Sequence, residues 1–423
     1  MNRWSFFLLF ILTSSALLAV VPAFGSDYTL EIFGNANMDG IIDEKDIAYI
    51  KGVINARNIP TLLSDANGDG IVDDRDAEQV EKILKGTEEQ IILIDDANRT
   101  IKIDMPVKSV VPLVDRDAKI LGVLDAQDLA VAVSNNIKDS KEYEITLSGL
   151  TKLEAVGSWT EPDLEKLLKI KPDLLIAYST YAKAINASIG ERVDVIGFSS
   201  STPETTKDEL LKLSYVLGRR ENADVYFNEF HDKYLNLIAD RVDGISADLR
   251  PSVYVESSSQ AYKTYNKNSV VEKLITLAGG KHVFGDLEGS GAFATLDAEE
   301  IIKRNPDVII KYAEKNDSGY ESGDPAKMQA LRDEILGRPE LAKVNAVMNG
   351  QVYVMSSYLS YGTDYPVLVM YWSKWLHPDL FADIDPEAIH REYLSRFCEK
   401  DYLPGEQGFF VYPAGDASPG LSG

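Results

Sequence analysis

The stretch D-L-E-K-L-L-K-I-K-P-D-L-L-I at residues 163–176 returns as D-A-E-E-I-I-K-R-N-P-D-V-I-I at residues 297–310, shifted by 134 positions. Each copy predicts a short helix that begins at a capping Asp and stops before a Pro. The four apolar residues that follow are typical of a buried parallel strand. The repeat extends at the same shift to three flanking pairs: Gly157 with Gly291, Trp159 with Phe293, and Tyr178 with Tyr312. Two copies of one helix–strand unit predict two lobes of related α/β fold.

Working outward from the repeat, further strands are expected in both lobes, at 108–114, 193–198, 252–255 and 352–355. Helical patterns separate these strands, which favours open, mostly parallel sheets. Residues 222–248 carry one long apolar stripe, which predicts a stiff helix between the lobes. The expected fold is α/β, with two Rossmann-like lobes joined by a long helix. Its predicted parts are an N-terminal lobe at 90–215, the connecting helix at 216–249, a C-terminal lobe at 250–400 and a tail at 401–423.

A crevice between two such lobes is the expected binding site, because ligands of open α/β sheets settle at the carboxyl ends of the strands. The candidate ligand-binding residues are Arg116, Trp159, Tyr178, Tyr181, Tyr262, Tyr265, Phe293, Tyr312 and Tyr361. Arg116 either faces an anionic ligand or forms an ion pair with Asp115 or Asp117. Aromatic walls with polar rims suit large, flat, amphipathic ligands. Bare ferric iron held by tyrosinates remains an alternative.

The composition excludes several other classes. The 423 residues include 43 Lys and Arg against 67 Asp and Glu, a net charge of −24, so nucleic acid is not an expected partner. Cys398 is the only cysteine, which excludes an intramolecular disulfide and a Cys-rich metal site. Four widely spaced histidines are too few for a poly-His metal site. The sequence also has no G-x-x-x-x-G-K-[ST], G-x-S-x-G or H-E-x-x-H, so an enzyme is not expected.

Residues 1–25 are typical of a targeting segment. A short positive end precedes an apolar run at 6–21 and small residues at Ala23 and Gly25, which predicts a signal peptide at 1–25. An uncleaved membrane anchor is the alternative, since the run approaches the ~20 residues that span a bilayer. No cysteine is present there for a lipid anchor. The mature protein is expected to be secreted, cell-surface or periplasmic, with retention at the membrane by the uncleaved segment as the other possibility.

Two acidic loops follow, thirty residues apart, at 35–46 (N-A-N-M-D-G-I-I-D-E-K-D) and 65–76 (D-A-N-G-D-G-I-V-D-D-R-D). Oxygen-bearing side chains fall at loop positions 1, 3, 5, 9 and 12, a glycine at position 6 allows the bend, and position 7 offers its carbonyl. This is the spacing that a hard cation needs, and it predicts two Ca²⁺ sites. The expected ligands are Asn35, Asn37, Asp39, Ile41, Asp43 and Asp46, then Asp65, Asn67, Asp69, Ile71, Asp73 and Asp76.

A short amphipathic helix follows each loop with the same apolar spacing, so the pair is expected to bury its stripes against each other in one small all-α, EF-hand-like domain at 27–88. The two loop–helix units resemble the dockerin type I family, whose loops also end in Asp. That resemblance implies a cohesin-like partner. Glu44-Lys45 and Asp74-Arg75, however, differ from the Ser/Thr pairs common at the positions that set cohesin choice. A calcium-stabilised spacer is the alternative role.

Residues 90–400 resemble the class III substrate-binding proteins of ABC importers, which serve ferric siderophores, haem and vitamin B12. The similar stretches are 94–111, V-G-S-W-T-E-P-D-L-E-K-L-L-K-I-K-P-D-L-L-I-A at 156–177, and 365–381. The resemblance implies capture of a metal chelate, such as an iron-siderophore or a corrinoid, and delivery to a permease and ATPase complex. It also implies that Glu165 and Glu299 dock into arginine pockets of the permease, although either glutamate also suits a helix dipole. The alternative function is a calcium-dependent cell-surface scaffold that docks to a cohesin-like partner.

Overall fold

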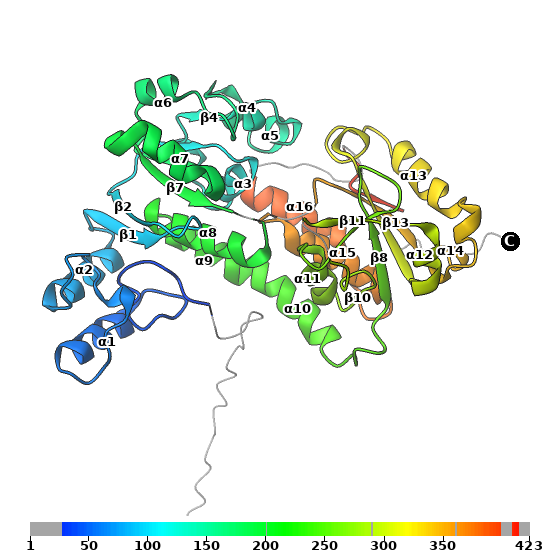
Figure 1. The fold of residues 1–423 in the computed structure, drawn as a ribbon, viewed down its shortest axis with the longest axis horizontal. Helices are drawn as coiled ribbons and strands as arrows, with labels where there is room; N and C mark the ends of the chain where they lie inside the picture. Colours follow the sequence, from blue (N-terminus) through cyan, green and yellow to red (C-terminus); the bar gives the residue numbers. More distant parts are fainter. Residues whose placement is uncertain (1–27, 200, 289–290, 360–361, 399–407, 414–423) are drawn as a thin grey trace, which may run out of the picture.

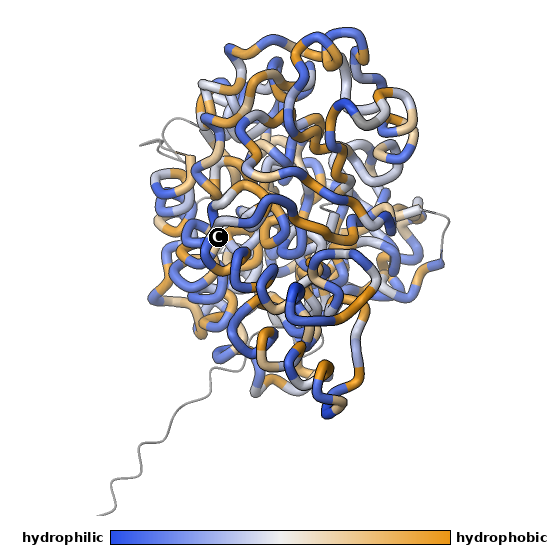
Figure 2. Tube along the Cα trace, turned by 90° about the vertical axis from the view of Figure 1, so that its left-hand side faces the viewer, coloured by the Kyte–Doolittle hydropathy of each residue, from blue (hydrophilic) through white to orange (hydrophobic). Residues whose placement is uncertain are grey.

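The computed structural model describes residues 28–199, 201–288, 291–359, 362–398 and 408–413, and the predicted signal segment lies outside them. Two α/β lobes lie at either end of a long helical connection, and the paired acidic loops lie beside the N-terminal lobe (Figure 1). Hydrophilic and hydrophobic residues alternate over short distances along the trace, as in a chain whose elements each bury one face (Figure 2).

The N-terminal lobe is built on a parallel sheet of order β3-β6-β7. A second, small parallel pair, β4 with β5, continues beside β3. The strands of this lobe are β3 (Val110–Pro112), β4 (Ala132–Val133), β5 (Glu154–Ala155), β6 (Leu174–Tyr178) and β7 (Asp194–Phe198). Its helices are α3 (Asp115–Val123), α4 (Asn135–Lys138), α5 (Lys141–Thr146), α6 (Leu164–Ile170), α7 (Ser179–Ile189) and α8 (Pro203–Val216).

The C-terminal lobe has a seven-stranded sheet with the path β11-β9-β8-β12-β13-β14, and β10 also pairs with β8. Its strands are β8 (Ser252–Glu256), β9 (Lys263–Tyr265), β10 (Lys281–His282), β11 (Phe293–Thr295), β12 (Val308–Ala313), β13 (Val352–Ser356) and β14 (Val411–Tyr412). Its helices are α11 (Val271–Leu277), α12 (Ala298–Arg304), α13 (Ala326–Leu336), α14 (Asn345–Met348), α15 (Tyr365–Leu376) and α16 (Pro386–Phe397).

This C-terminal sheet is more mixed than predicted. The strands β8, β10, β12 and β13 are parallel, but β9, β11 and β14 are antiparallel additions. β14 comes from the stretch expected to be a tail, and its Val411 and Tyr412 pair with Met355 and Val354 of β13. These added strands are two or three residues long, too short for alternation to reveal in a sequence.

The repeated units fold as α6–β6 and α12–β12, each helix capped by its Asp, Asp163 or Asp297. The Asp before each strand then ties down the neighbouring strand. Ser109 Oγ donates to Asp173 Oδ2 at 2.9 Å, and Ser252 Oγ donates to Asp307 Oδ2 at 2.7 Å. The two lobes therefore share the same Asp–Ser contact between neighbouring strands. The repeat also places Tyr178 and Tyr312 at matched strand ends.

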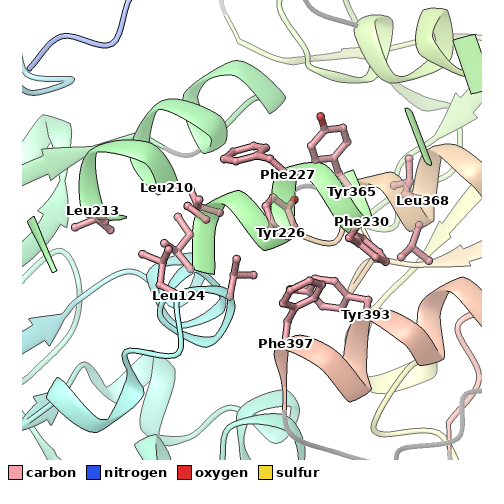
Figure 3. Close-up of a cluster of buried hydrophobic side chains, with 14 of the residues drawn as sticks. Leu124, Leu210, Leu213, Tyr226, Phe227, Phe230, Tyr365, Leu368, Tyr393 and Phe397 are labelled. Atoms are coloured by element: carbon pink, nitrogen blue, oxygen red, sulfur yellow. The ribbon is translucent and has the colours of Figure 1, made fainter. Parts of the chain in front are cut away.

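One continuous helical stretch connects the lobes, formed by α9 (Arg220–Tyr226), a π-helical turn (Phe227–His231) and α10 (Asp232–Val242). It is shorter than the predicted 216–249. α16 returns from the C-terminal lobe to pack against α3 (Figure 1). Side chains of the connection meet Tyr365 and Leu368 of α15 and Tyr393 and Phe397 of α16 in one buried aromatic cluster (Figure 3). The lobes are thus held by three packed helices rather than one.

The paired-loop module contains α1 (Glu44–Ile54) and α2 (Asp74–Lys85), which pack against each other, followed by the hairpin β1 (Gln90–Ile94) and β2 (Thr100–Asp104). The predicted separate all-α domain is not what the structure shows. Phe33 N donates to Ile92 O, and Ile94 N donates to Glu31 O, so the segment before the first loop pairs with β1. Leu30, Ile32 and Ile50 belong to the same hydrophobic core as the N-terminal lobe. The apolar stripes are therefore buried against the lobe as well as against each other.

Candidate functional site

A groove of about 410 Å³ opens between the two lobes. The N-terminal lobe contributes residues from the start of α3, the end of β6 and the chain that enters α8. The C-terminal lobe contributes the segments around β9, β11 and α11 and the ends of β12 and β13. The lining residues are Arg116, Tyr178, Ser201, Thr202, Ser258, Tyr265, Asn268, Ser269, Val270, Val271, Leu274, Ala292, Phe293, Tyr312 and Ser357. The groove lies where parallel strands of both lobes end, as the topology requires.

Five of the nine predicted ligand residues line this groove: Arg116, Tyr178, Tyr265, Phe293 and Tyr312. The C-terminal wall is aromatic, because Tyr265 lies opposite Phe293 across the β9–β11 pair, with ring centroids 4.9 Å apart. The Tyr312 ring lies 6.0 Å from that of Tyr265. Phe293 remains 45% exposed, so the wall has free apolar surface for a ligand.

Trp159 and Tyr181 stand behind Tyr178 rather than in the groove lining. The Trp159 ring packs edge-on against Tyr178 at 5.5 Å and against Tyr181 at 5.6 Å. They hold the Tyr178 ring in place from the N-terminal lobe. The matched pair Trp159 and Phe293 has therefore diverged, one residue supporting the wall and the other forming it.

The structure places Tyr262 away from the groove, which contradicts its prediction as a ligand residue. Its hydroxyl bonds Glu340, and the Arg338 guanidinium lies 4.6 Å from its ring centre. Tyr262 directly precedes β9, whereas Tyr265 ends that strand, so closeness in the sequence did not place both rings in the groove. Tyr361 lies outside the described residues.

Sequence reasoning missed the polar rim of the groove. Ser201 and Thr202 follow β7, and Ser257 and Ser258 follow β8, so hydroxyl-rich runs occur directly after buried strands in both lobes. That position was visible in the sequence as S-S-S-T-P at 199–203 and S-S-S at 257–259. A search for polar runs at strand ends would have found them.

Arg116 sits in the first turn of α3, and a buried carboxyl pair lies next to it. Asp117 and Glu209 are 1% and 0% exposed, and each is close enough to shift the pKa of the other. Burial, together with the nearby charges of Asp117 and Asp96, raises the pKa of Glu209 well above its usual value. Burial likewise raises the pKa of Asp117. Burial of two neighbouring acids therefore favours their protonated forms over the charged ones.

A smaller cavity of about 170 Å³ adjoins the groove and shares Arg116 and Ser357 with it. At its floor, Lys119 of α3 pairs with Glu142 at 3.0 Å and with Asp364 at 2.8 Å. All three side chains are more than nine-tenths buried, and Asp364 comes from the C-terminal lobe. This triad is an ion-paired bridge between the lobes next to the groove, and it fixes their relative position.

Glu165 and Glu299 lie at matching positions in the first turns of α6 and α12. Both are exposed, and neither forms an ion pair with another described residue. The structure thus leaves both carboxylates accessible on the outer ends of the two lobes.

The two acidic loops share the contacts of their last carboxylate, because Asp76 accepts from Asn67 and Asp73 as Asp46 does in the first loop. In the first, Asp46 is fully buried and its carboxylate accepts from the backbone N–H groups of Asn37 and Asp43. Asn35 is also fully buried, and its Oδ1 has no hydrogen-bond partner within the described chain. In the second loop, Arg75 pairs with Asp69 and Asp73, both at 2.8 Å.

These contacts bear on whether the loops suit calcium. A buried oxygen without a partner at position 1 of the first loop is what a cation would satisfy. Burial raises the pKa of Asp46 to about 6, and the nearby charges of Asp39 and Asp43 act in the same direction. Across the described ranges, however, no group of three or more His, Cys, Asp or Glu side chains is gathered so that it could hold a metal ion. The oxygen-bearing side chains at the loop positions are of the type that binds Ca²⁺. To coordinate the ion together, the carboxylates would have to move closer to one another than they are in the structure.

A family model described as periplasmic binding protein matches residues 110–359, and the chain belongs to that family. The match begins after the paired-loop module, which therefore lies outside it. Within the described parts of the chain, no helix has the length and apolar character to cross a membrane.

Curated relatives are similar over much of the chain. The molybdate-binding protein MolA of Haemophilus influenzae is 25% identical, over 74% of this chain and 92% of the relative. The ABC transporter substrate-binding lipoprotein YvrC of Bacillus subtilis is 25% identical over 63% of this chain and 79% of its own. A vitamin B12-binding protein of Salmonella typhimurium is 24% identical over 38% of this chain and 58% of the relative. Their names describe binding proteins.

Solved structures share the two-lobed fold. A TroA-like periplasmic binding protein, FepB, from Veillonella parvula has a TM-score of 0.64 at 20% identity, covering 77% of this chain and 99% of that one. MolA of Haemophilus influenzae bound to molybdate has a TM-score of 0.58 at 20% identity, covering 74% and 99%.

Proposed function

We propose that this protein is the extracytoplasmic substrate-binding protein of an ABC importer, which captures an iron-siderophore or corrinoid-type metal chelate and delivers it to the permease. The observation that carries the proposal is the groove of about 410 Å³ between the lobes, with aromatic rings on one wall and Arg116 on the other. That volume lies within the range of pockets for organic ligands, roughly 300–1,000 Å³.

A bare oxyanion is the second candidate ligand. Arg116, Ser201 and Thr202 offer a positive charge and hydroxyl donors on the N-terminal wall, and a relative is named for molybdate. An oxyanion would use only this wall and leave the Tyr265 and Phe293 rings uncovered. The aromatic wall therefore favours the chelate. The scaffold alternative has no support from the relatives, which are binding proteins of transporters.

The ligand is tested by a thermal-shift screen of the mature protein against ferric siderophores, haem, cobalamin, cobinamide and molybdate. A ligand present at 100 times its Kd adds about 2.7 kcal/mol to the free energy of unfolding. Phe293→Ala is expected to lower chelate affinity about tenfold or more, because it removes an exposed ring from the wall. Ile302→Ala, an equally exposed position on α12, is the control. The proposal fails if no chelate shifts the melting temperature.

Docking to the permease through Glu165 and Glu299 is the second part of the proposal. Their exposure without ion pairs supports it, since a free carboxylate can accept a bidentate arginine contact. Replacing both by Lys is expected to abolish uptake in cells while the Kd for the ligand stays unchanged. Uptake at the wild-type rate would rule out this role.

We further propose that the paired loops bind Ca²⁺, with the first loop supported by the unpartnered Asn35 Oδ1. Asn35, Asn37, Asp39, Asp43, Asp46 and the Ile41 carbonyl would hold the ion there. Isothermal titration with CaCl₂ measures it, and Asn35→Leu is expected to remove the first site and leave the second. A titration without heat change in wild-type protein would refute the proposal.

A further inference from the structure

The peptide group between Ile41 and Ile42 joins the first acidic loop to the ligand-binding lobe. Its carbonyl, at loop position 7, is the one that the spacing assigns to a cation. Its N–H, on Ile42, donates to the Tyr215 hydroxyl of α8 at 3.2 Å. Ile42 is 3% exposed and Tyr215 is 7% exposed. One peptide group therefore carries both the carbonyl assigned to the cation and the N–H bonded to α8.

Tyr28 makes a second link between the same loop and the same helix. A Cβ atom added to Gly40, the glycine at the bend of the loop, would lie 3.4 Å from the Tyr28 ring. The Tyr28 hydroxyl donates to Asp208 of α8 at 2.9 Å. Asp208 also pairs with Lys212 at 2.7 Å, and Lys212 reaches Glu31 at 3.5 Å. The bend of the loop, the preceding segment and α8 are thus in direct contact.

The hairpin provides a third link, at the groove end of α8. Glu31 and Phe33 pair with β1, and the hairpin tip after β1 carries Asp95 and Asp96. Asp96 Oδ2 accepts from the backbone N–H of Ser199 at 2.8 Å, directly after β7. The chain that continues from there enters α8 through Thr202, which caps the helix and lines the groove. α8 is therefore held by the module at its middle and its end, and by the hairpin where it begins.

We propose that calcium binding in the first loop stiffens α8 and thereby regulates the ligand groove. This inference rests on the proposed ligand and calcium functions, but it concerns this chain's own link between them. A cation drawn to the Ile41 carbonyl polarises the peptide group and strengthens the Ile42 N–H to Tyr215 hydrogen bond. Ordering the loop also fixes Gly40 against Tyr28. Local openings of α8 then become rarer, and the wall formed by Thr202 is better ordered before the ligand arrives.

Hydrogen exchange of the full mature chain, without ligand, tests the inference with CaCl₂ against EDTA. In the wild type, calcium is expected to slow amide exchange both in the loops and in α8, by about fivefold in α8, the worth of one neutral hydrogen bond. In the double variant Tyr28→Phe, Tyr215→Phe, which lacks both hydroxyls, calcium is expected to slow exchange in the loops only. Tyr215→Phe alone provides a milder variant that loses a single hydrogen-bond acceptor.

Tyr49→Phe is the matched control, because the Tyr49 hydroxyl donates to Ile59 O within the module and does not reach α8. It should behave as the wild type. Calcium protection confined to the loops in wild-type protein would overturn the coupling, and so would equal protection of α8 in the double variant. An absence of any calcium effect would overturn it together with the calcium sites. Since no chelate is used, none of these results depends on the importer hypothesis.

Discussion

The two lobes are built on the same repeated unit, yet one buried glutamate in each has surroundings of opposite charge. In the C-terminal lobe, Glu256 at the end of β8 is fully buried and receives two hydrogen bonds from Arg338, at 2.7 and 2.9 Å. In the N-terminal lobe, Glu209 is equally buried against another acid, Asp117. Glu256 is surrounded by cations, whereas Glu209 lies beside a second acid.

The pKa directions follow from this difference. Burial alone would raise the pKa of Glu256, but the hydrogen bonds from Arg338 and the charge of Lys311 outweigh it and hold the pKa below its usual value. The pKa of Glu209 is raised by burial and by negative neighbours. Repetition of a fold unit therefore fixes the backbone and leaves the electrostatics of each lobe free to diverge.

The largest expected effect breaks the C-terminal arrangement. Arg338→Ala leaves Glu256 buried with Lys311 as the one remaining cation described beside it, and it is expected to lower the free energy of unfolding by about 3–5 kcal/mol. Urea denaturation followed by circular dichroism measures it. Arg391→Ala, which removes a partly exposed pair with Glu387 on α16, is the control and should cost about 0.5 kcal/mol or less. Similar losses for both variants would contradict the comparison.

The N-terminal pair is expected to appear as a pH dependence. Because the pKa values of Asp117 and Glu209 are raised on folding, the folded state holds protons that the unfolded state releases. Stability from this pair is thus present at low pH and is lost as the pH rises through the raised pKa values. Asp96, Asp115 and Arg116 also lie near the pair. The positive charge of Arg116 lowers both pKa values, but it offsets only part of the increase caused by burial and the acidic neighbours.

Glu209→Gln should flatten that dependence by about 1–2 kcal/mol between pH 5 and pH 8, since each unit of pKa shift is worth 1.36 kcal/mol. Urea midpoints across this range measure it. Glu165→Gln, an exposed carboxylate on α6, should leave the pH profile of the wild type unchanged. Parallel profiles for Glu209→Gln and the wild type would show that the pKa values of the pair are not raised on folding.

The smallest expected effect tests what the lobes have in common. Asp173→Asn and Asp307→Asn each weaken the hydrogen bonds to the matched serines, Ser109 and Ser252. Each is expected to cost about 1 kcal/mol, because the aspartates are partly exposed. Thermal denaturation measures both. If the two losses in the free energy of unfolding differ by more than about 1 kcal/mol, the repeated Asp–Ser contact has diverged in strength as well.

The sequence predicts the repeated units well because both of their signals are local. The capping Asp, the Pro after the helix and the three apolar residues at the end of each copy all lie within fourteen residues. These signals predicted α6–β6 and α12–β12. Tyr178 and Tyr312 end the two strands and line the groove. The family resemblance agrees with the periplasmic binding protein match.

What the sequence could not show depends on contacts between distant segments. Nothing near Tyr262 indicates that Arg338 and Glu340, over seventy residues later, draw it away from the groove. The pairing of residues 31–33 with β1 joined the paired-loop module to the lobe, although amphipathic helices of that kind also suit a separate domain. The acid pair Asp117 and Glu209 could not be predicted for the same reason, because each residue alone is typical of a solvent-exposed position on a helix.

The placement of α16 and β14 sets an order on synthesis. Phe397, at the end of α16, packs beside α3 in the N-terminal lobe, and Val411 and Tyr412 complete the edge of the other sheet. Neither half can therefore reach its final packing until residues 386–412 have left the ribosome.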